Sequence, residues 1–177
     1  MGMDSDKLSR RTKQPGHDQT YRRSEENFIQ ALQDLLPSDR YRIVDHPRDL
    51  AGLLGGRYGI VPEASIEYRK TGRKMYFEVK KQGERGNADE RACKHHTVQF
   101  YKTLAAHTGY DYHAFCTVMC SALSWHERYT TKHPFYFEED HYLLWTDYDL
   151  SVLDEYLKRI GRKFLERVHT PKRDLPA

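Results

Sequence analysis

Long apolar runs are missing from this chain of 177 residues. No stretch approaches the ~18 consecutive apolar residues that a membrane-spanning helix needs, and the mean hydropathy is −0.89. The first residues carry Lys and Arg but lack the apolar stretch of a secretory signal. Three cysteines, an odd number without regular spacing, favour a reducing compartment over secretion. We therefore expect a cytoplasmic protein with no membrane partner.

Several common catalytic motifs are absent as well. Neither a Walker-type loop nor a Gly-x-Gly-x-x-Gly loop is present, so we expect no nucleotide cofactor. The ten histidines include no pair of the metalloprotease type. Cys116 and Cys120 lack two further ligands at zinc-site spacing and should pack in the core. His95 and His96 are expected at the surface, and phosphate contact is the rarer alternative for them.

The positive charge is concentrated in one part of the chain. Between Arg69 and Lys94 there are nine Lys or Arg and four Asp or Glu, a net charge of +5. The whole chain carries only +3, so the remaining residues sum to −2. A basic patch in a near-neutral body indicates a polyanion partner such as nucleic acid. A solvated basic face explains the charge alone equally well.

The order of periodic segments predicts a single α/β domain. Residues 1–23 are polar and without periodicity, which indicates a flexible N-terminal arm, and residues 24–177 should form the domain. Apolar positions at helical spacing predict three helices, and short apolar runs predict strands between them. The segment 125–140 reads as a loop. The expected result is a mixed β-sheet flanked by helices, with helices at 24–36, 87–108 and 152–168 and strands at 41–44, 64–68, 75–79, 112–123 and 141–146.

The most regular segment predicts a β-hairpin. Apolar residues alternate along 64–68 and again along 75–79, and Gly72 lies between them where a tight turn needs a positive φ. A two-residue loop at Thr71-Gly72 would pair Glu63 with Lys80 and Ser65 with Glu78. The polar face would then gather four charged side chains within reach of one another: Glu63, Glu67, Glu78 and Lys80.

Two carboxylates and an amine on one strand face can support hydrolysis. Glu63 and Glu78 could hold Mg²⁺, which commonly takes one or two carboxylates and completes its shell with water and phosphate. Lys80 would orient an attacking water or, with a lowered pKa, accept its proton. Glu67 is a rival ligand nearer the turn. Spacing alone favours a simpler interpretation, a solvated face of ion pairs.

A wider set of residues carries a family resemblance. Residues 59–67, the Glu-x-Lys segment around Glu78 and Lys80, and the sequence Gly-Asn-Ala-Asp-Glu-Arg at 86–91 resemble the MunI and EcoRI family of type II restriction endonucleases. This family lies within the PD-(D/E)xK nuclease superfamily, and the likeness is closer on the MunI side. It extends over about residues 24–105 and implies a restriction-endonuclease-like fold.

The resemblance also implies catalytic roles. Glu63 and Glu78 correspond to the two acids that bind Mg²⁺, and Lys80 to the lysine that handles the attacking water. Glu63 stands where the family usually has Asp, so its longer side chain shifts the metal and puts full activity in question. Glu25, with Glu26 as the weaker choice, corresponds to an acid on the first helix of the family.

The same resemblance implies how DNA is read. In the family, the Gly-Asn-Ala segment reads the inner AATT of a palindrome from the major groove. Asn87 suits adenine on chemical grounds, because its amide matches the N7 and N6 groups of that base. Arg85 would read an outer guanine, pointing to CAATTG, although the stretch before Arg85 is shorter here than in the MunI branch. The full expected DNA-binding set is Lys81, Arg85, Gly86, Asn87, Ala88, Glu90, Arg91 and Lys94.

Asn87 and Glu90 also have a structural interpretation. Asn87 can cap the helix that follows, and Glu90, three residues later, completes a capping box. In the family interpretation Glu90 instead braces Arg91 for base reading. Because capping and base reading use the same oxygen of Asn87, both roles cannot be satisfied fully at once.

Together these features predict a Mg²⁺-dependent type II restriction endonuclease that cuts double-stranded DNA at a palindrome with an AATT core. The family implies 5′-phosphate ends with 5′ overhangs and a restriction-modification system in a bacterial or archaeal cytoplasm. A palindrome implies a homodimer, for which residues 87–109 and 125–140 are the expected surface. Two alternatives remain, a repair or structure-specific nuclease and a non-catalytic DNA-binding module.

Overall fold

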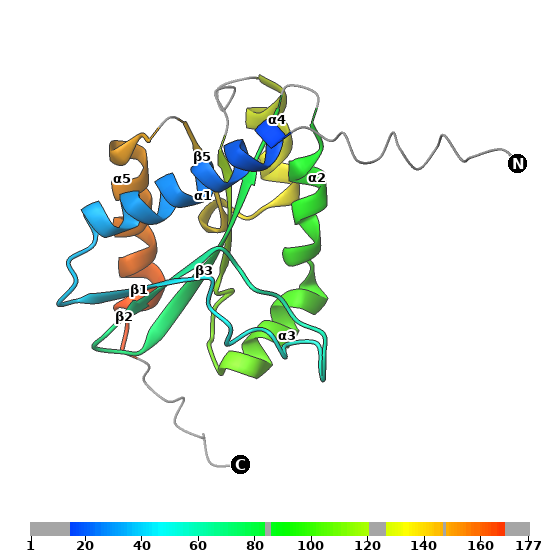
Figure 1. Ribbon diagram of the computed structural model, residues 1–177. Helices are drawn as coiled ribbons and strands as arrows, with labels where there is room; N and C mark the ends of the chain where they lie inside the picture. Colours follow the sequence, from blue (N-terminus) through cyan, green and yellow to red (C-terminus); the bar gives the residue numbers. More distant parts are fainter. Residues whose placement is uncertain (1–14, 84–85, 121–126, 147, 169–177) are drawn as a thin grey trace, which may run out of the picture.

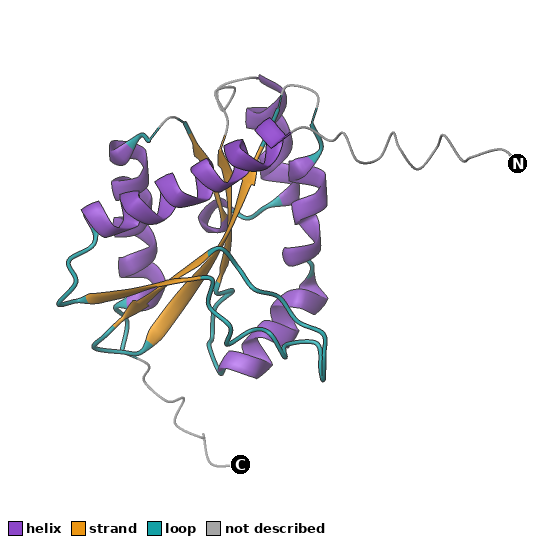
Figure 2. Ribbon diagram, viewed as in Figure 1, coloured by secondary structure: helices purple, strands orange, loops and turns teal. Residues whose placement is uncertain are grey.

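A five-stranded mixed sheet forms the centre of the molecule (Figures 1 and 2). The computed structural model describes residues 15–83, 86–120, 127–146 and 148–168. The strands lie in sequence order. The second strand is antiparallel to the first and third, and the fourth and fifth are added parallel to the third. They are β1 (Tyr41–Asp45), β2 (Ala64–Tyr68), β3 (Arg73–Lys81), β4 (Phe115–Cys120) and β5 (Tyr142–Trp145). The predicted α/β class and mixed sheet are confirmed.

Helices cover both faces of the sheet (Figure 1). One face packs against α1 (Pro15–Leu35) and α5 (Leu150–Ile160), which also contact each other. The other face packs against α2 (Ala88–Ala92), α3 (Val98–Thr108) and α4 (Glu127–Tyr136). Within the described residues, no helix combines the length and the apolar character needed to cross a membrane.

Alternation along the hairpin places its apolar face in the core beneath α1. Ile66, Met75 and Phe77 are at most 1% exposed, as the predicted period of two requires. Phe28 of α1 packs against this face, with its ring centroid 5.3 Å from that of Phe77 and 5.5 Å from that of Trp145 on β5. Cys116 and Cys120 are buried on β4, as expected.

The predicted hairpin register is wrong by two residues. The turn spans four residues, Arg69 to Gly72, because the amides of Thr71 and Gly72 both bond to the carbonyl of Tyr68, at 3.1 and 2.8 Å. Ser65 therefore pairs with Tyr76, and Glu67 pairs with Lys74. Gly72 does adopt a positive φ of 71°. A shift of two residues preserves the faces, so the charged side chains still share one side.

Two helix predictions and one loop prediction also need correction. The first helix begins at Pro15 and not at Ser24, so it includes part of the expected arm. The predicted helix over 87–108 is broken by a 3₁₀ turn, Cys93–His95, because the Thr97 hydroxyl accepts from the Phe100 amide and starts a separate helix, α3. That helix ends where predicted, at Gly109, whose φ is 72°. Part of the expected loop at 125–140 is helical, as α4.

The last predicted helix also ends earlier than expected. Regular α-helix stops at Ile160, and a π-helical turn, Gly161–Leu165, follows. The Glu166 amide bonds to the Gly161 carbonyl at 2.8 Å, which is the five-residue spacing of a π-turn. The expected helix over 152–168 therefore combines two kinds of helix.

Candidate active site

Glu63, Glu78 and Lys80 meet at the edge of the paired region of β2 and β3. In the observed register, Glu63 lies one position beyond the Ala64–Phe77 pair and so faces Glu78 and not Lys80. One Glu63 oxygen accepts a hydrogen bond from the Val79 amide at 2.9 Å, and the other lies 3.5 Å from Lys80 Nζ. Lys80 Nζ also forms an ion pair with Glu78 Oε1. The three predicted catalytic side chains are therefore brought together.

Burial makes this cluster electrostatically demanding. The side chains of Glu63 and Glu78 are only 12% and 13% exposed, and that of Lys80 is 31% exposed. Burial, followed by the charge of Glu78, raises the pKa of Glu63 to about 7. Burial lowers the pKa of Lys80, but the two carboxylates outweigh it and the net shift is upward. An ammonium that stays charged favours the orienting role of Lys80 over the proton-accepting one.

The donor set fits a hard divalent cation. Two largely buried carboxylates share one ammonium, and a cation between them would favour the charged form of Glu63. Across the part of the chain that the structure describes, no group of three or more His, Cys, Asp or Glu could hold a metal ion. Mg²⁺ accepts such a site, because it commonly takes one or two carboxylates with water and substrate phosphate.

The structure separates the rival acid from this cluster. Glu67 lies toward the turn, where its nearest cation is Lys74 at 3.9 Å. Lys74 Nζ in turn binds Asp49 at 2.8 Å. Glu67 therefore belongs to a second group of charges, and Glu63 is the better partner for Glu78.

Glu25 approaches the same end of the sheet from α1. Burial raises the pKa of the Cys120 thiol to about 12, and the negative charges of Glu25 and Glu63 add to that effect, while Lys81 opposes it. Cys120 is paired with Lys81 at the carboxyl ends of β4 and β3. Glu25 and Lys81 thus lie within electrostatic reach of the strand ends that carry the cluster.

The predicted DNA-reading residues follow β3 directly. Asn87, Glu90, Arg91 and Lys94 are exposed, and Gly86 and Ala88 are half-buried. Arg85 lies outside the described residues. The Asn87 amide and the Arg91 guanidinium are therefore accessible to an external ligand, in the segment that directly follows β3.

The predicted capping box is wrong. The side chain of Asn87 makes no capping bond, because Gln82 Oε1 accepts from the Asp89 amide at 3.1 Å and Asp89 Oδ1 accepts from the Glu90 amide at 2.9 Å. Glu90 instead binds Lys132 of α4 at 2.7 Å. Asn87 is thereby released from the structural role that competed with base reading.

Two buried ionisable residues were missed by sequence reasoning. Asp89 of α2 and His133 of α4 are fully buried, and Asp89 Oδ2 lies 3.6 Å from His133 Nε2. Burial lowers the pKa of His133 even though Asp89 opposes that shift. No local spacing could have revealed the pair, since its members lie on different helices and meet only through packing.

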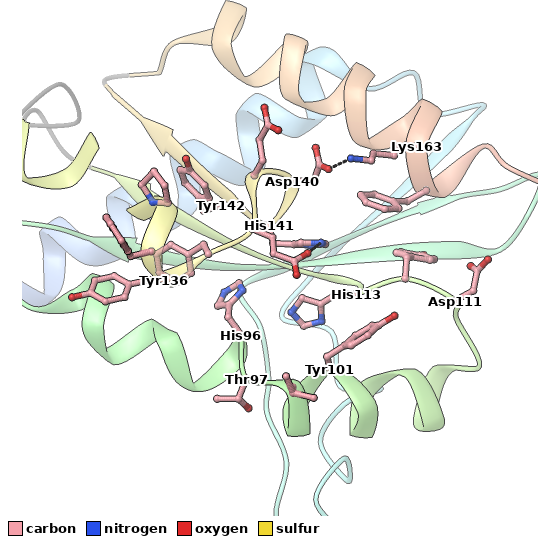
Figure 3. A pocket seen from close by; sticks show the side chains of 18 residues that line it. His96, Thr97, Tyr101, Asp111, His113, Tyr136, Asp140, His141, Tyr142 and Lys163 are labelled. Carbon is pink, nitrogen blue, oxygen red and sulfur yellow. Dashed lines mark hydrogen bonds and ion pairs between the residues drawn. The ribbon is translucent and has the colours of Figure 1, made fainter. Parts of the chain in front are cut away.

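A cavity of about 1010 Å³ lies between α3, α4 and the residues around His141 (Figure 3). His96, His113 and His141 point into it, together with Tyr101 and Tyr136. Glu63, Glu78 and Lys80 are not among its lining residues. The surface position expected for His95 and His96 is not observed. His95 is only 4% exposed, and His96 Nε2 lies 2.8 Å from Thr117 Oγ1 in the sheet.

Comparison with known proteins identifies the architecture. The sequence matches no protein-family model and no curated protein. The fold is similar to that of the MunI restriction endonuclease, whose structure was solved in complex with cognate DNA. The TM-score is 0.60 and the identity 20%, over 71% of this chain and 83% of that one. With its mixed five-stranded sheet and flanking helices, the chain therefore has a restriction-endonuclease-like fold.

Proposed function

We propose that this protein is a Mg²⁺-dependent endonuclease that cleaves double-stranded DNA at a short palindrome with an AATT core. The observation that carries the proposal is the partly buried cluster of Glu63, Glu78 and Lys80 at the end of β3. Three further features support it: the restriction-endonuclease-like fold, the basic charge of residues 69–94, and the exposed Asn87 and Arg91.

The proposed reaction is hydrolysis of a phosphodiester bond. Water attacks the phosphorus in line, the 3′ oxygen leaves, and the product carries a 5′-phosphate. Glu63 and Glu78 would hold Mg²⁺, which supplies charge stabilisation at the phosphoryl oxygens and a more acidic water. The Lys80 ammonium, fixed between the two carboxylates, would orient the attacking water and face the developing negative charge. The Val79 amide holds Glu63 in place for this arrangement.

The proposed recognition uses the segment after β3. Asn87 would accept from N6 and donate to N7 of adenine in the major groove. Arg91 and Lys94 would contact bases or phosphates from the exposed side of the segment. CAATTG is the first site to test, because the resemblance assigns the outer guanine to Arg85. The family resemblance also suggests 5′ overhangs of AATT.

A palindromic site calls for a two-fold symmetric protein, so we propose a homodimer. Three exposed apolar side chains line the cavity described above: Val98 at 69%, Tyr101 at 38% and Phe135 at 85% exposed. They lie on α3 and α4, within the surface expected from the sequence.

Sedimentation velocity should find a dimer, and Phe135→Glu should shift it to monomer. A wild-type monomer with DNA bound would contradict this assembly.

One digestion tests the proposed activity. Plasmids with a single CAATTG, GAATTC or bare AATT site are incubated with the protein and Mg²⁺, and the fragment ends are sequenced. Discrete linear products with cuts outside AATT would support restriction. A preference for branched substrates would indicate a repair nuclease, and binding without cleavage would indicate a DNA-binding module.

A further inference from the structure

Gln82 joins the catalytic strand to the segment that follows it. Its backbone amide continues the sheet by donating to the Cys120 carbonyl at 3.0 Å, two positions after Lys80. Its side chain is buried, with the whole residue 3% exposed. The Nε2 group donates to the Gly86 carbonyl at 2.7 Å and to the Gly83 carbonyl at 3.2 Å. The Oε1 atom accepts from the Asp89 amide at 3.1 Å.

Tyr129 of α4 completes this set of bonds. Its hydroxyl donates to the Gly83 carbonyl and lies 3.2 Å from Gln82 Nε2, which shares its two hydrogens among the three acceptors around it. Tyr129 is 1% exposed, so the bonds are made away from water, where losing a partner is costly. Together Gln82 and Tyr129 fix the carbonyls of Gly83 and Gly86 and the first turn of α2. We call these two side chains the Gln82–Tyr129 clamp.

The glycine at position 86 fits this clamp. A Cβ atom there would lie 3.2 Å from Gln82 Nε2 and 3.3 Å from the Gly83 carbonyl oxygen, closer than ordinary contact. Any larger residue would therefore require the Gln82 amide or the Gly83 backbone to shift by a few tenths of an ångström. A glycine at position 86 therefore leaves the buried amide of Gln82 undisturbed.

The residues that the clamp positions are the ones proposed to read bases. Gly86 precedes Asn87, and Asp89 precedes Glu90 and Arg91. Further contacts between the two helices, Lys132 with Glu90 at 2.7 Å and His133 with Asp89 at 3.6 Å, hold α2 against α4. The Asn87 side chain, in contrast, makes no capping bond, so its direction depends on how the backbone on either side is held.

We propose that Gln82 is a positioning residue for DNA sequence discrimination. It holds the base-reading segment at a fixed place relative to Lys80, so that a correctly read site presents its phosphate to the catalytic cluster. This inference rests on the proposed function. It goes further by assigning discrimination to a buried amide that touches neither base nor phosphate.

The test compares Gln82→Glu with Gln33→Glu. Both change an amide into a carboxylate of the same shape, but Gln33 is exposed on α1. Gln82→Glu loses the Nε2 donors to Gly83 and Gly86, and we expect the ratio of cognate to non-cognate cleavage to fall roughly tenfold to a hundredfold. The ratio is the informative readout, since general destabilisation lowers both rates together. An unchanged ratio in folded Gln82→Glu would overturn the proposal.

A buried carboxylate can prevent folding, so a milder variant accompanies it. Tyr129→Phe removes one hydroxyl and keeps the ring, and it should lower the same ratio by severalfold, about the effect of one buried hydrogen bond. Gly86→Ala should also lower this ratio, because the added methyl group forces the Gln82 amide or the Gly83 backbone to shift by a few tenths of an ångström. If Tyr129→Phe and Gly86→Ala both retain wild-type discrimination, the clamp does not position the reading segment.

Hydrogen exchange separates failure of this inference from failure of the proposed function. The Asp89 amide, bonded to Gln82 Oε1, should exchange faster in Tyr129→Phe and in Gly86→Ala than in the wild type. Faster exchange in a protein that cleaves no DNA would retain the clamp and reject the nuclease. Unchanged exchange in both variants would reject the clamp, whatever the wild type cleaves.

Discussion

Two clusters of ionisable side chains lie on the same face of the sheet, and burial opposes the charged form in both, but only one of them stays charged. At the end of β3, Glu63, Glu78 and Lys80 remain a cluster of unlike charges, although burial raises the pKa of Glu63 to about 7. Around the cavity, burial lowers the pKa of His96 to about 3 and that of His113 to about 4. Thr117 links the two regions, since it pairs with Glu78 in the sheet and contacts His96.

The difference follows from the charge state that each cluster can adopt when it is buried. The histidines are neutral at pH 7, so they pack as aromatic rings; the centroids of His113 and His141 are 4.9 Å apart. The two carboxylates have only one ammonium between them and retain an excess negative charge that burial opposes. The cavity therefore presents a neutral, aromatic surface. The excess negative charge of the acidic cluster instead favours binding of a cation.

The largest expected effect comes from removing the ammonium. Lys80→Ala should reduce cleavage roughly 10²–10³-fold, the range for losing one preorganised donor that faces developing negative charge, while DNA binding in Ca²⁺ stays near wild type. Single-turnover cleavage and a mobility-shift assay measure the two quantities. Lys70→Ala, an exposed lysine at the hairpin turn, is the control. If Lys80→Ala cleaves at a near wild-type rate, the acidic cluster is not the catalytic site.

A smaller loss should follow from removing one carboxylate. Glu63→Gln or Glu78→Gln should slow cleavage roughly a hundredfold, because metal-ion stabilisation is worth several kcal/mol, and higher Mg²⁺ should restore part of the rate. Glu67→Gln, on the same sheet face but beside Lys74, is the matched control. Equal losses from Glu67→Gln and Glu63→Gln would mean that the two charge groups do not differ in function.

A third variant tests recognition separately from catalysis. Arg91→Ala should weaken specific DNA binding by about 1–3 kcal/mol, the effect of one good base contact, with less change on unrelated DNA. Competition binding with an AATT duplex and a scrambled duplex gives both values. Arg42→Ala, exposed on the edge strand β1, should leave the difference between them intact.

Two features could be predicted because they depend on the two-residue period of side chains along a strand: the sheet, and the shared face of Glu63, Glu78 and Lys80. Side chains at alternate positions share a face whatever the exact turn, so the register error of two residues still left all three together. The turn length could not be predicted, since Thr71-Gly72 is compatible with both a two-residue and a four-residue loop. Gly72 itself was informative, because its positive φ of 71° is required in the observed turn.

Contacts between distant segments could not be predicted from the sequence pattern. The clamp joins Gln82 to Tyr129 across two elements, and α4 itself was expected to be a loop. The histidine pair was misplaced for the same reason. Its polarity predicted a surface position, but packing against Phe115 and Phe137 makes neutral histidine act as an aromatic residue.

The last expected effect concerns acid stability and not activity, and it comes from the neutral histidines. The pKa of His113 in the folded protein is about 4, below its ordinary 6.5, so the unfolded chain binds this proton first on acidification. Its contribution to stability is complete above pH 6.5 and is lost as the pH falls toward 4, at up to about 1.4 kcal/mol per pH unit.

His113→Gln should therefore flatten the pH dependence of the unfolding free energy between pH 6.5 and 4, measured by urea denaturation at several pH values. His107→Gln, at an exposed position on α3, should retain the wild-type slope. Equal slopes in wild type and His113→Gln would mean that His113 is charged inside the folded protein. The contrast between a charged acidic cluster and a neutral histidine cavity would then be lost, and the cavity would become a candidate site for an anion.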